Sequence, residues 1–301
     1  MTTDPATDPA PGGPDAAPVA EEPARLLVGG TEVARYVVDP ALDARHGPRP
    51  YLHPVRTLGG TVVTDALPAD HVWHLGASLA VQDVDGVNLW GGRTYVRDVG
   101  YTWREDHGRI VHTGWTRRSA DRLAHQLQWR DPRGRVLLAE RRQLAASAVT
   151  PDVWRLDLDS ALTAPPDRSV RLGSPATNGR PGGAGYGGFF WRAVAAGGEA
   201  TVFTAEATGE EAINGSATPW LALAGTGPGG GAYTLVFAGL GLGDRWFART
   251  AMYPGVCVAF AFDQPAEVPA ATTRHGSYQV WIADGTLSPA QCATLASARR
   301  S

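Results

Sequence analysis

The 301-residue chain lacks lysine altogether, and all 27 of its basic residues are arginine. This absence excludes every mechanism that depends on a lysine amine, because no Schiff base, pyridoxal phosphate anchor or P-loop lysine contact can form without one. Arginine codon usage in a GC-rich genome accounts for such a bias. The chemical exclusion holds whatever the cause.

Cysteine is almost as scarce. Only Cys257 and Cys292 are present, and they are too far apart in the sequence to form a C-x-x-C pair. A disulfide framework and a thiolate zinc site are therefore not expected. Cys257 lies in the apolar run GVCVAFAF, which is typical of a small buried hydrophobic residue.

The chain also has neither a strong net charge nor a long apolar run. Its net charge is −3, so no global field would gather nucleic acid or an anionic membrane. No uncharged apolar run approaches the ~18 residues needed to span a bilayer, and the N-terminus has neither the basic nor the apolar segment of a signal peptide. We therefore expect a cytoplasmic protein with no nucleic-acid or membrane partner.

The composition, 43% hydrophobic and 19% charged residues, is that of a folded globular protein. Residues 1–24 are the exception, because they consist mostly of Pro, Ala, Asp, Gly and Thr and predict a disordered N-terminal tail. The rest of the chain predicts one β-sandwich domain over residues 25–285. A C-terminal helix follows within residues 286–301.

Alternation of apolar and polar residues is the main structural signal. In the run VWRLDLDSAL at residues 153–162, Trp154, Leu156 and Leu158 alternate with polar residues, which predicts a half-buried antiparallel strand. Short β-branched or aromatic runs recur along the chain, separated by turns such as Gly29-Gly30 and the segment at 131–134. With no βαβ alternation, we expect an all-β fold, an antiparallel β-sandwich. The one good helical signal is C-terminal, where Ser288 suits an N-cap and Pro289 the first helical position.

The stretch ADHVWHLG, residues 69–76, is the first candidate site. Asp70 precedes His71, and His74 follows three residues later. Pro68 lies upstream and Gly76 precedes the strand-like run ASLAVQDV, so we expect a loop at the rim of the sandwich that leads into a strand. Binding residues concentrate on such loops, since a rigid scaffold aims them.

A third imidazole, His53, lies between Tyr51 and Pro54, and it leaves three interpretations open. In the first, His53, His71 and His74 bind Zn²⁺, Fe²⁺ or Mn²⁺, and Asp70 is a fourth ligand or orients a ring. In the second, the histidines act as general acid and base without metal, and Arg56 binds a carboxylate or hydroxyl pair of the substrate. In the third, they only tie loops together.

A second candidate site is the glycine-rich stretch GSPATNGRPGGAGYGGFFWR at residues 173–192. Asn178, Arg180 and Tyr186 stand out as polar side chains on a backbone that can approach a ligand closely. Arg180 is suited to an anionic or polyhydroxylated ligand, and Phe190 or Trp191 to the apolar face of a sugar. The alternative is a wide turn that carries core aromatic residues.

Two common hydrolytic sites have no sequence support. No G-x-S-x-G nucleophile elbow is present. No pair of carboxylates is nominated for a retaining glycosidase.

Several motifs together resemble the DUF6807 family, often labelled PmoA-like or "methane oxygenase PmoA", over residues of about 25–285. They are RPYLHPVRTLGGTVVTD, ADHVWHLG, NLWGGRTYV, the glycine-rich stretch and the closing YQVWIADG. A particulate methane monooxygenase subunit is an integral membrane protein, so we set the activity in that label aside.

The resemblance implies a β-sandwich similar to galactose-mutarotase-like supersandwiches, whose concave sheet binds sugars. It also implies a genetic association with oxidoreductases of sugar catabolism. The residues that match the family's motif positions are His53, Arg56, Asp70, His71, His74 and Arg180.

We therefore expect a carbohydrate-active enzyme, a lyase, isomerase or hydrolase, that acts on a sugar or an oxidised glycoside. Its cofactor is undetermined, a divalent metal (Zn, Fe or Mn) being the candidate, and its partner is a small-molecule sugar. A homodimer is left open. The alternatives are a non-catalytic sugar-binding or scaffold protein and a metal-dependent oxygenase or tailoring enzyme of secondary metabolism.

Overall fold

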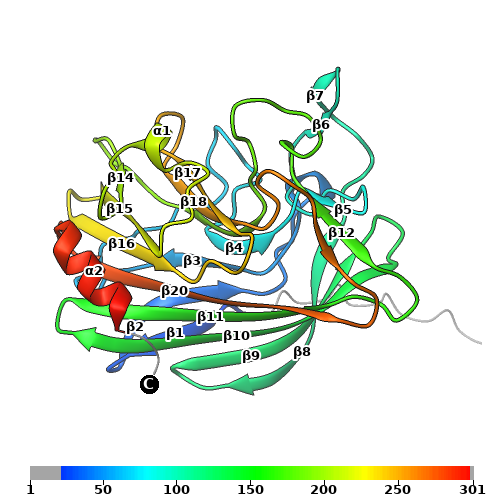
Figure 1. Ribbon diagram of the computed structural model, residues 1–301. Coiled ribbons are helices and arrows are strands. Elements are labelled where there is room, and N and C mark those ends of the chain that lie inside the picture. The colour runs from blue at the N-terminus through cyan, green and yellow to red at the C-terminus, as the bar shows by residue number, and fades with distance from the viewer. Residues whose placement is uncertain (1–21, 299–301) are drawn as a thin grey trace, which may run out of the picture.

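Two large antiparallel sheets packed face to face form the body of the protein (Figure 1). The structure is a computed structural model and describes residues 22–298. The predicted all-β class with a short C-terminal helix is confirmed. Most of the predicted tail, residues 1–24, lies outside the described residues, and the first strand begins at Ala24.

The first sheet has seven strands and joins segments that are far apart in the sequence. In spatial order it contains β1 (Ala24–Val28), β2 (Thr31–Val37), β3 (Tyr51–Val55), β4 (Ala77–Ala80), β13 (Gly188–Arg192), β18 (Gly255–Ala259) and β17 (Arg245–Arg249). The strand β13 follows the glycine-rich stretch and pairs with β4, which follows ADHVWHLG. This pairing brings the two candidate segments together.

The second sheet has eight strands. In spatial order it contains β14 (Thr201–Phe203), β15 (Trp220–Thr226), β16 (Ala232–Ala238), β20 (Thr273–Asp284), β11 (Val153–Thr163), β10 (Val136–Thr150), β9 (Arg122–Arg130) and β8 (Arg109–Arg118). The strand predicted at 153–162 is β11, and the turn predicted at 131–134 joins β9 to β10.

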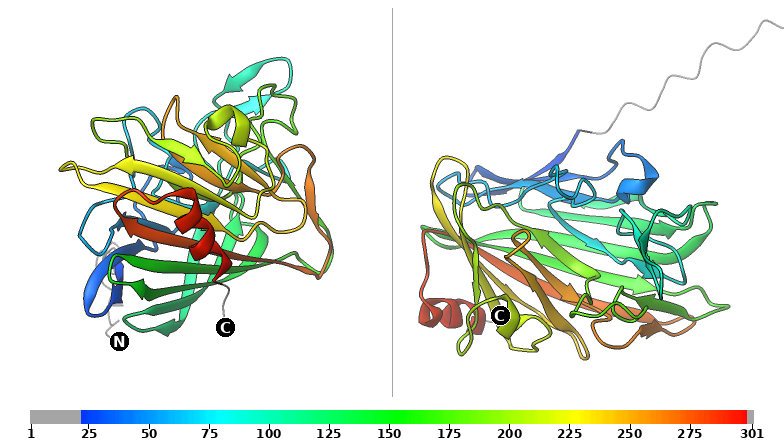
Figure 2. Two further views of the ribbon diagram at one scale, coloured as in Figure 1. Left: turned by 60° about the vertical axis from the view of Figure 1, so that its left-hand side comes forward. Right: turned by 90° about the horizontal axis from the view of Figure 1, so that it is seen from above.

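The remaining strands form two small sheets. One contains β19 (Ala266–Val268), β12 (Val170–Gly173) and β5 (Asp83–Val84). The other is a hairpin of β6 (Thr94–Val96) and β7 (Gly100–Thr102). This hairpin projects from the body of the molecule, as Figures 1 and 2 show from different directions.

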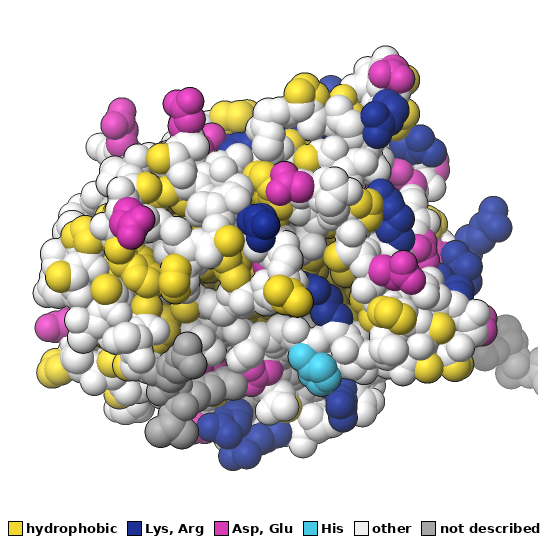
Figure 3. Space-filling model, in the orientation of Figure 1, with side chains coloured by type: hydrophobic (Ala, Val, Ile, Leu, Met, Phe, Trp, Pro, Cys, Tyr) yellow, Lys and Arg dark blue, Asp and Glu magenta, His cyan; other side chains and the backbone are white. Residues whose placement is uncertain are grey.

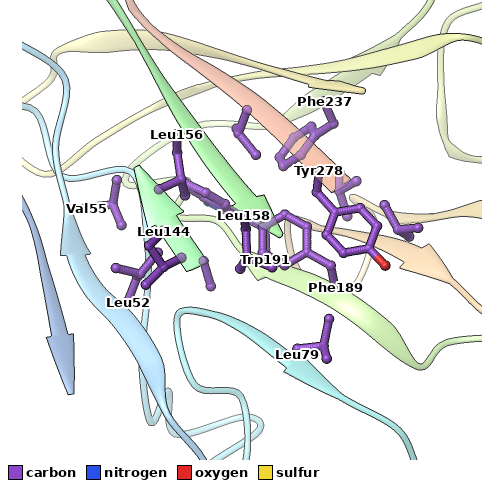
Figure 4. Close-up of a cluster of buried hydrophobic side chains, with 14 of the residues drawn as sticks. Leu52, Val55, Leu79, Leu144, Leu156, Leu158, Phe189, Trp191, Phe237 and Tyr278 are labelled. Atoms are coloured by element: carbon purple, nitrogen blue, oxygen red, sulfur yellow. The ribbon is translucent and has the colours of Figure 1, made fainter. Parts of the chain in front are cut away.

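The main core lies between the inner faces of the two large sheets (Figure 4). Side chains of both sheets meet there, among them Leu52, Leu79, Phe189 and Trp191 from the first and Leu144, Leu158, Phe237 and Tyr278 from the second. Successive side chains of a strand point to opposite faces of its sheet. The neighbours of these core residues along a strand therefore point away from the main core. In β13, Phe189 and Trp191 face the core, whereas Phe190 joins a separate cluster on the outer face of the seven-stranded sheet.

Helices cover little of the molecule. The helix α2 (Pro289–Ser297) begins at Ser288 with the predicted cap, whose side chain accepts from the backbone N–H of Gln291 in a capping box. It packs against the outer side of β15 and β16, and its buried residue Cys292 belongs to the same cluster as Trp281 (Figure 2). The other helical segments are α1 (Glu210–Ile213) and the 3-10 turn η1 (Ala44–His46).

A buried ion pair crosses the inner face of β10. The side chains of Glu140 and Arg142, 0% and 1% exposed, are joined by two hydrogen bonds of 2.8 Å, as expected for residues on one strand face. Trp129 and Ser160 donate to the same carboxylate at 2.7 and 2.8 Å, and Arg142 donates to the hydroxyl of Tyr36 at 3.0 Å. The carboxylate is therefore compensated both in charge and in hydrogen bonds.

The face shown in Figure 3 carries arginine and acidic side chains scattered among hydrophobic and neutral ones. Among residues 22–298, no helix is both long enough and apolar enough to cross a bilayer.

Candidate functional site

A cavity of about 480 Å³ opens on the outer face of the seven-stranded sheet. We call it the arginine–aromatic cavity, after the side chains of its wall. They are His71, His74, Arg93, Arg180, Arg249, Trp73, Trp90, Tyr101, Trp103, Tyr186, Phe247, Met252 and Tyr253, with Gly91. Both segments predicted to carry function contribute to it.

The strand alternation explains the floor of this cavity. Ala80 of β4, Phe190 of β13, Phe247 of β17 and Cys257 of β18 all point away from the main core and form an apolar cluster with Trp90. Such a cluster on the solvent side of a sheet needs a cover. The loops that carry Trp73, Tyr186 and Tyr253 provide it, and the space they leave open is the cavity.

The loop ADHVWHLG is neither helix nor strand, as predicted. Two successive turns shape it: the N–H of His71 donates to the carbonyl of Pro68 at 3.0 Å, and that of His74 to the carbonyl of His71 at 2.8 Å. These turns place both imidazoles on one side of the loop. Their rings stack with 4.7 Å between centroids and 12° between planes.

Asp70 and His71 form a dyad at the edge of the cavity. The Nδ1 of His71 lies 2.9 Å from the Oδ2 of Asp70. Partial burial raises the pKa of Asp70, but the hydrogen bond to His71 and the charge of Arg192 outweigh this effect and hold it below its usual value. Asp70 is therefore a carboxylate near neutral pH, and Nδ1–H of His71 donates to it. The lone pair of neutral His71 is then on Nε2, which has no hydrogen-bond partner within residues 22–298.

His74 is held in the complementary form. Its burial, followed by the charges of His71, Arg192 and Arg49, lowers its pKa well below the usual value, so the ring is neutral. The Nη1 of Arg192 donates to Nδ1 of His74 at 3.3 Å, which leaves the proton on Nε2. The stacked pair thus offers one acceptor, on His71, and one donor, on His74.

Arg192 connects these groups from beneath the loop. Its side chain is 7% exposed, and its Nη2 donates to both oxygens of Asp70 at 3.1 Å. The guanidinium also lies over the ring of Tyr253, 4.7 Å from the centroid. Arg192 is the last residue of the glycine-rich candidate stretch, but it was not predicted as a site residue, because no local pattern links it to His71, more than a hundred positions away.

The three arginines of the wall differ in their partners. Arg249 pairs with Glu210 at 3.3 Å and lies over the ring of Phe247. Arg180 donates to the hydroxyl of Tyr101 and lies 4.8 Å from that ring's centroid. Among the described residues, Arg93 and Arg180 pair with no carboxylate.

A chain of hydroxyl groups supports Arg180. The hydroxyl of Tyr101 lies 2.9 Å from that of Tyr186, and Gln82 donates to Tyr186 at 3.3 Å. Burial raises the pKa of Tyr101, an effect that its bonds to Tyr186 and Arg180 reduce but do not cancel. Its phenol therefore stays protonated and neutral beside the guanidinium.

Four predicted site residues lie away from the cavity wall. His53 bonds to Thr64 at 3.0 Å, and Arg56 donates to the carbonyl of Gly60 at 3.3 Å. Asn178 donates to Asp83 at 3.0 Å beside a separate, smaller hollow. Trp191 points into the main core and donates to the carbonyl of Val63. Trp191 was predicted to bind substrate, but it lies in the main core, as in the alternative of a turn with core aromatic residues. Both sides of β13 are buried, so the pattern does not reveal which one faces the core.

The predicted set of three metal-binding histidines is not assembled. His71 and His74 stack, but no group of three His, Cys, Asp or Glu side chains within residues 22–298 is arranged to hold a metal ion. His53 lies on β3, and its ring is hydrogen-bonded to the side chain of Thr64 instead. Of the predicted residues, the cavity gathers His71, His74, Arg180 and Tyr186, with Asp70 behind His71.

Several wall residues were not predicted as site residues. Trp90 and Arg93 lie in NLWGGRTYV, a motif that carries the family resemblance, so that motif was the available signal. Arg249 and Tyr253 come from the segment at and after β17, where the sequence offers no comparable signal.

The fold and the site define a β-sandwich protein with a basic, aromatic cavity on the outer face of one sheet. The chain matches the family described as "Family of unknown function (DUF6807)" over residues 24–297. It therefore belongs to the DUF6807 family, as the motifs predicted.

No curated protein matches the chain. Among solved structures it is similar to "Heparinase III-BT4657 gene product", with 14% identity, a TM-score of 0.25, and 58% of this chain and 21% of that chain covered. It is also similar to "Crystal structure of heparan sulfate lyase HepC from Pedobacter heparinus", with 9% identity, a TM-score of 0.26, and coverage of 60% and 22%. The chain spans about a fifth of the length of these proteins, and the TM-scores are too low to support an argument.

Proposed function

We propose that the protein is an enzyme that transfers a proton at a carbon next to the carbonyl group of a sugar or oxidised glycoside, with His71 as the general base. The observation that carries this proposal is the Asp70–His71 dyad. Nδ1 of His71 is bonded to Asp70, and Nε2 of His71 has no hydrogen-bond partner in the described chain. The dyad borders a cavity of about 480 Å³ with aromatic walls, which suits a sugar ring.

The step begins when Nε2 of His71 takes the proton from the carbon next to the carbonyl. The electron pair of that C–H bond forms a C=C bond, and the carbonyl π pair moves onto the oxygen as an enolate. Return of the proton to the former carbonyl carbon, with transfer of the neighbouring hydroxyl proton to the enolate oxygen, gives an isomer. If the enolate instead collapses and expels a β-oxygen substituent, the imidazolium of His71 returns its proton to that oxygen, and the reaction is an elimination.

The neighbouring groups support the charge that this step creates. His74 is neutral with its proton on Nε2, so it is suited to donate a hydrogen bond to the enolate oxygen. Asp70 stabilises the imidazolium of His71 once it forms. The wall arginines supply positive charge for the enolate oxygen.

The arrangement favours a lyase or an isomerase over a hydrolase. Glycoside hydrolysis by the usual route needs two carboxyl groups on either side of the bond to be broken. Within the described residues, the cavity wall includes no Asp or Glu, and Asp70 is bound to His71 and Arg192.

Proton exchange in D₂O tests the proposal. We expect the protein to exchange the hydrogen next to the carbonyl in at least one member of a panel of keto-sugars and sugar acids, as followed by ¹H NMR. His71→Asn should slow this exchange about 10²–10⁴-fold, the usual contribution of a general base. His275→Asn is the matched control, because His275 is exposed on β20 and is not part of the cavity wall.

The result also separates catalysis from binding. A folded His71→Asn variant that exchanges at the wild-type rate would contradict the role of His71. Binding of a sugar without any exchange would favour the alternative, a sugar-binding protein that performs no chemistry.

A further inference from the structure

The charge of the cavity wall is unbalanced. Three arginines line it, and no acidic side chain of the described residues does. Glu210 pairs with Arg249 at 3.3 Å, which leaves Arg93 and Arg180 without a carboxylate partner. Two uncompensated guanidinium groups beside aromatic walls create a positive potential where the local dielectric constant is lowered.

Arg180 is held in place before any ligand binds. It is half-buried, donates to Tyr101, and is supported through that hydroxyl by Tyr186 and Gln82. Tyr101 belongs to the β6–β7 hairpin and Tyr186 to the glycine-rich stretch, so two separate segments fix the guanidinium. Arg93 is exposed and comes from the loop before β6. It lines the same cavity and pairs with no carboxylate among the described residues.

We propose that the substrate carries a carboxylate, as a uronic acid residue does, and that Arg93 and Arg180 bind it. The inference rests on the proposed function and names the substrate class for it. Guanidinium groups match planar carboxylates through paired hydrogen bonds. Sulfate and phosphate groups are also anions, but neither accepts the electron pair that the loss of a C–H proton leaves behind. A carboxylate does.

This assignment defines the reacting atoms. In a uronate residue the C5–H bond lies next to the C6 carboxylate. When His71 takes the C5 proton, the electron pair moves toward C6 and its oxygens carry the added negative charge, which the two guanidinium groups stabilise. Protonation of C5 by a water molecule from the opposite face, with loss of the proton from His71 to solvent, inverts C5. Expulsion of the oxygen substituent at C4, which receives the proton, leaves a C4=C5 double bond.

Ligand binding tests the inference independently of catalysis. Isothermal titration would compare methyl β-D-glucuronide with the neutral methyl β-D-glucoside, glucose 6-sulfate and glucose 6-phosphate. We expect the glucuronide to bind at least ~10-fold more tightly than the other three, since a charge-assisted bidentate contact contributes more than ~1.4 kcal/mol.

Variants of the two arginines then test whether they bind the carboxylate. Arg93→Gln and Arg180→Gln should each weaken glucuronide binding about 10-fold and leave glucoside binding unchanged. Arg180→Lys should restore part of the loss, because it keeps the charge but not the planar fork. Arg97→Gln is the matched control: Arg97 is exposed in the same hairpin region but is not part of the cavity wall. Thermal unfolding would verify that each variant is folded.

Three results would overturn the inference: equal affinity for glucuronide and glucoside, tighter binding of the sulfate or phosphate, or unchanged glucuronide affinity in both glutamine variants. Absence of binding at millimolar glucuronide would overturn it as well. These outcomes differ from failure of the proposed function. Arginine-dependent glucuronide binding without C5–H exchange would refute the catalytic role and keep the carboxylate site. His71-dependent exchange on a neutral keto-sugar, with no glucuronide binding, would do the reverse.

Discussion

Replacement of Arg142 by methionine is expected to destabilise the fold by about 3–5 kcal/mol, the usual effect of removing one partner of a buried ion pair. The change leaves the Glu140 carboxylate, 0% exposed, without its counter-ion and without two hydrogen bonds of 2.8 Å. Trp129 and Ser160 still donate to it, but they carry no charge. A folded domain is stable by only about 5–15 kcal/mol, so this loss is a large share of the total.

Equilibrium unfolding in guanidinium chloride, followed by tryptophan fluorescence, measures the effect. The double variant Glu140→Gln/Arg142→Met should lose less stability than the single variant, because no buried charge remains. Arg141→Met is the matched control and should change stability by less than ~0.5 kcal/mol, since Arg141 is exposed on the opposite face of β10. A loss below ~1 kcal/mol for Arg142→Met, or a double variant as unstable as the single one, would refute the reasoning.

Two further predictions concern stability. Burial, with the charges of Arg142 and His112, lowers the pKa of His125 to about 2. The unfolded chain binds a proton there below pH ~6.5 and the folded chain does not, so stability falls by up to ~1.4 kcal/mol per unit as the pH drops from 6.5 toward 2. Denaturation curves between pH 7 and 4 should show a weaker pH dependence in His125→Gln, and an unchanged slope would contradict this. Gly76→Ala should lower the Tm more than Gly60→Ala: both have positive φ, but a Cβ at Gly76 meets the carbonyl oxygen of Leu52 at 2.1 Å, whereas nothing lies within 4 Å at Gly60.

The strands and the helix were predictable because their signals are local. Alternation over residues 153–162 matches β11, and Ser288 with Pro289 marks the beginning of α2. Each signal depends only on neighbours along the chain, since strand periodicity and helix capping involve residues a few positions apart.

The candidate site was predicted in part. The segment with His71 and His74 is a loop that leads into β4, as predicted, and Arg180 and Tyr186 reach the same cavity. The prediction that Trp191 binds substrate was wrong, because Trp191 lies in the main core. The strand β13 is buried on both faces, and its sequence does not distinguish the main core from the floor of the cavity. In such strands the period of two remains, but both sets of side chains are apolar.

The amino-acid sequence by itself determined the all-β class, the C-terminal helix, the family and the absence of lysine chemistry, since these follow from composition, local periodicity and motif order. Only the tertiary structure decided which groups meet. Pairing of β4 with β13 brings Arg192 to Asp70 and His74, and the β6–β7 hairpin brings Tyr101 to Arg180. Contacts between such distant segments depend on sheet order and on which strand face is covered, and no pattern of neighbouring residues encodes either.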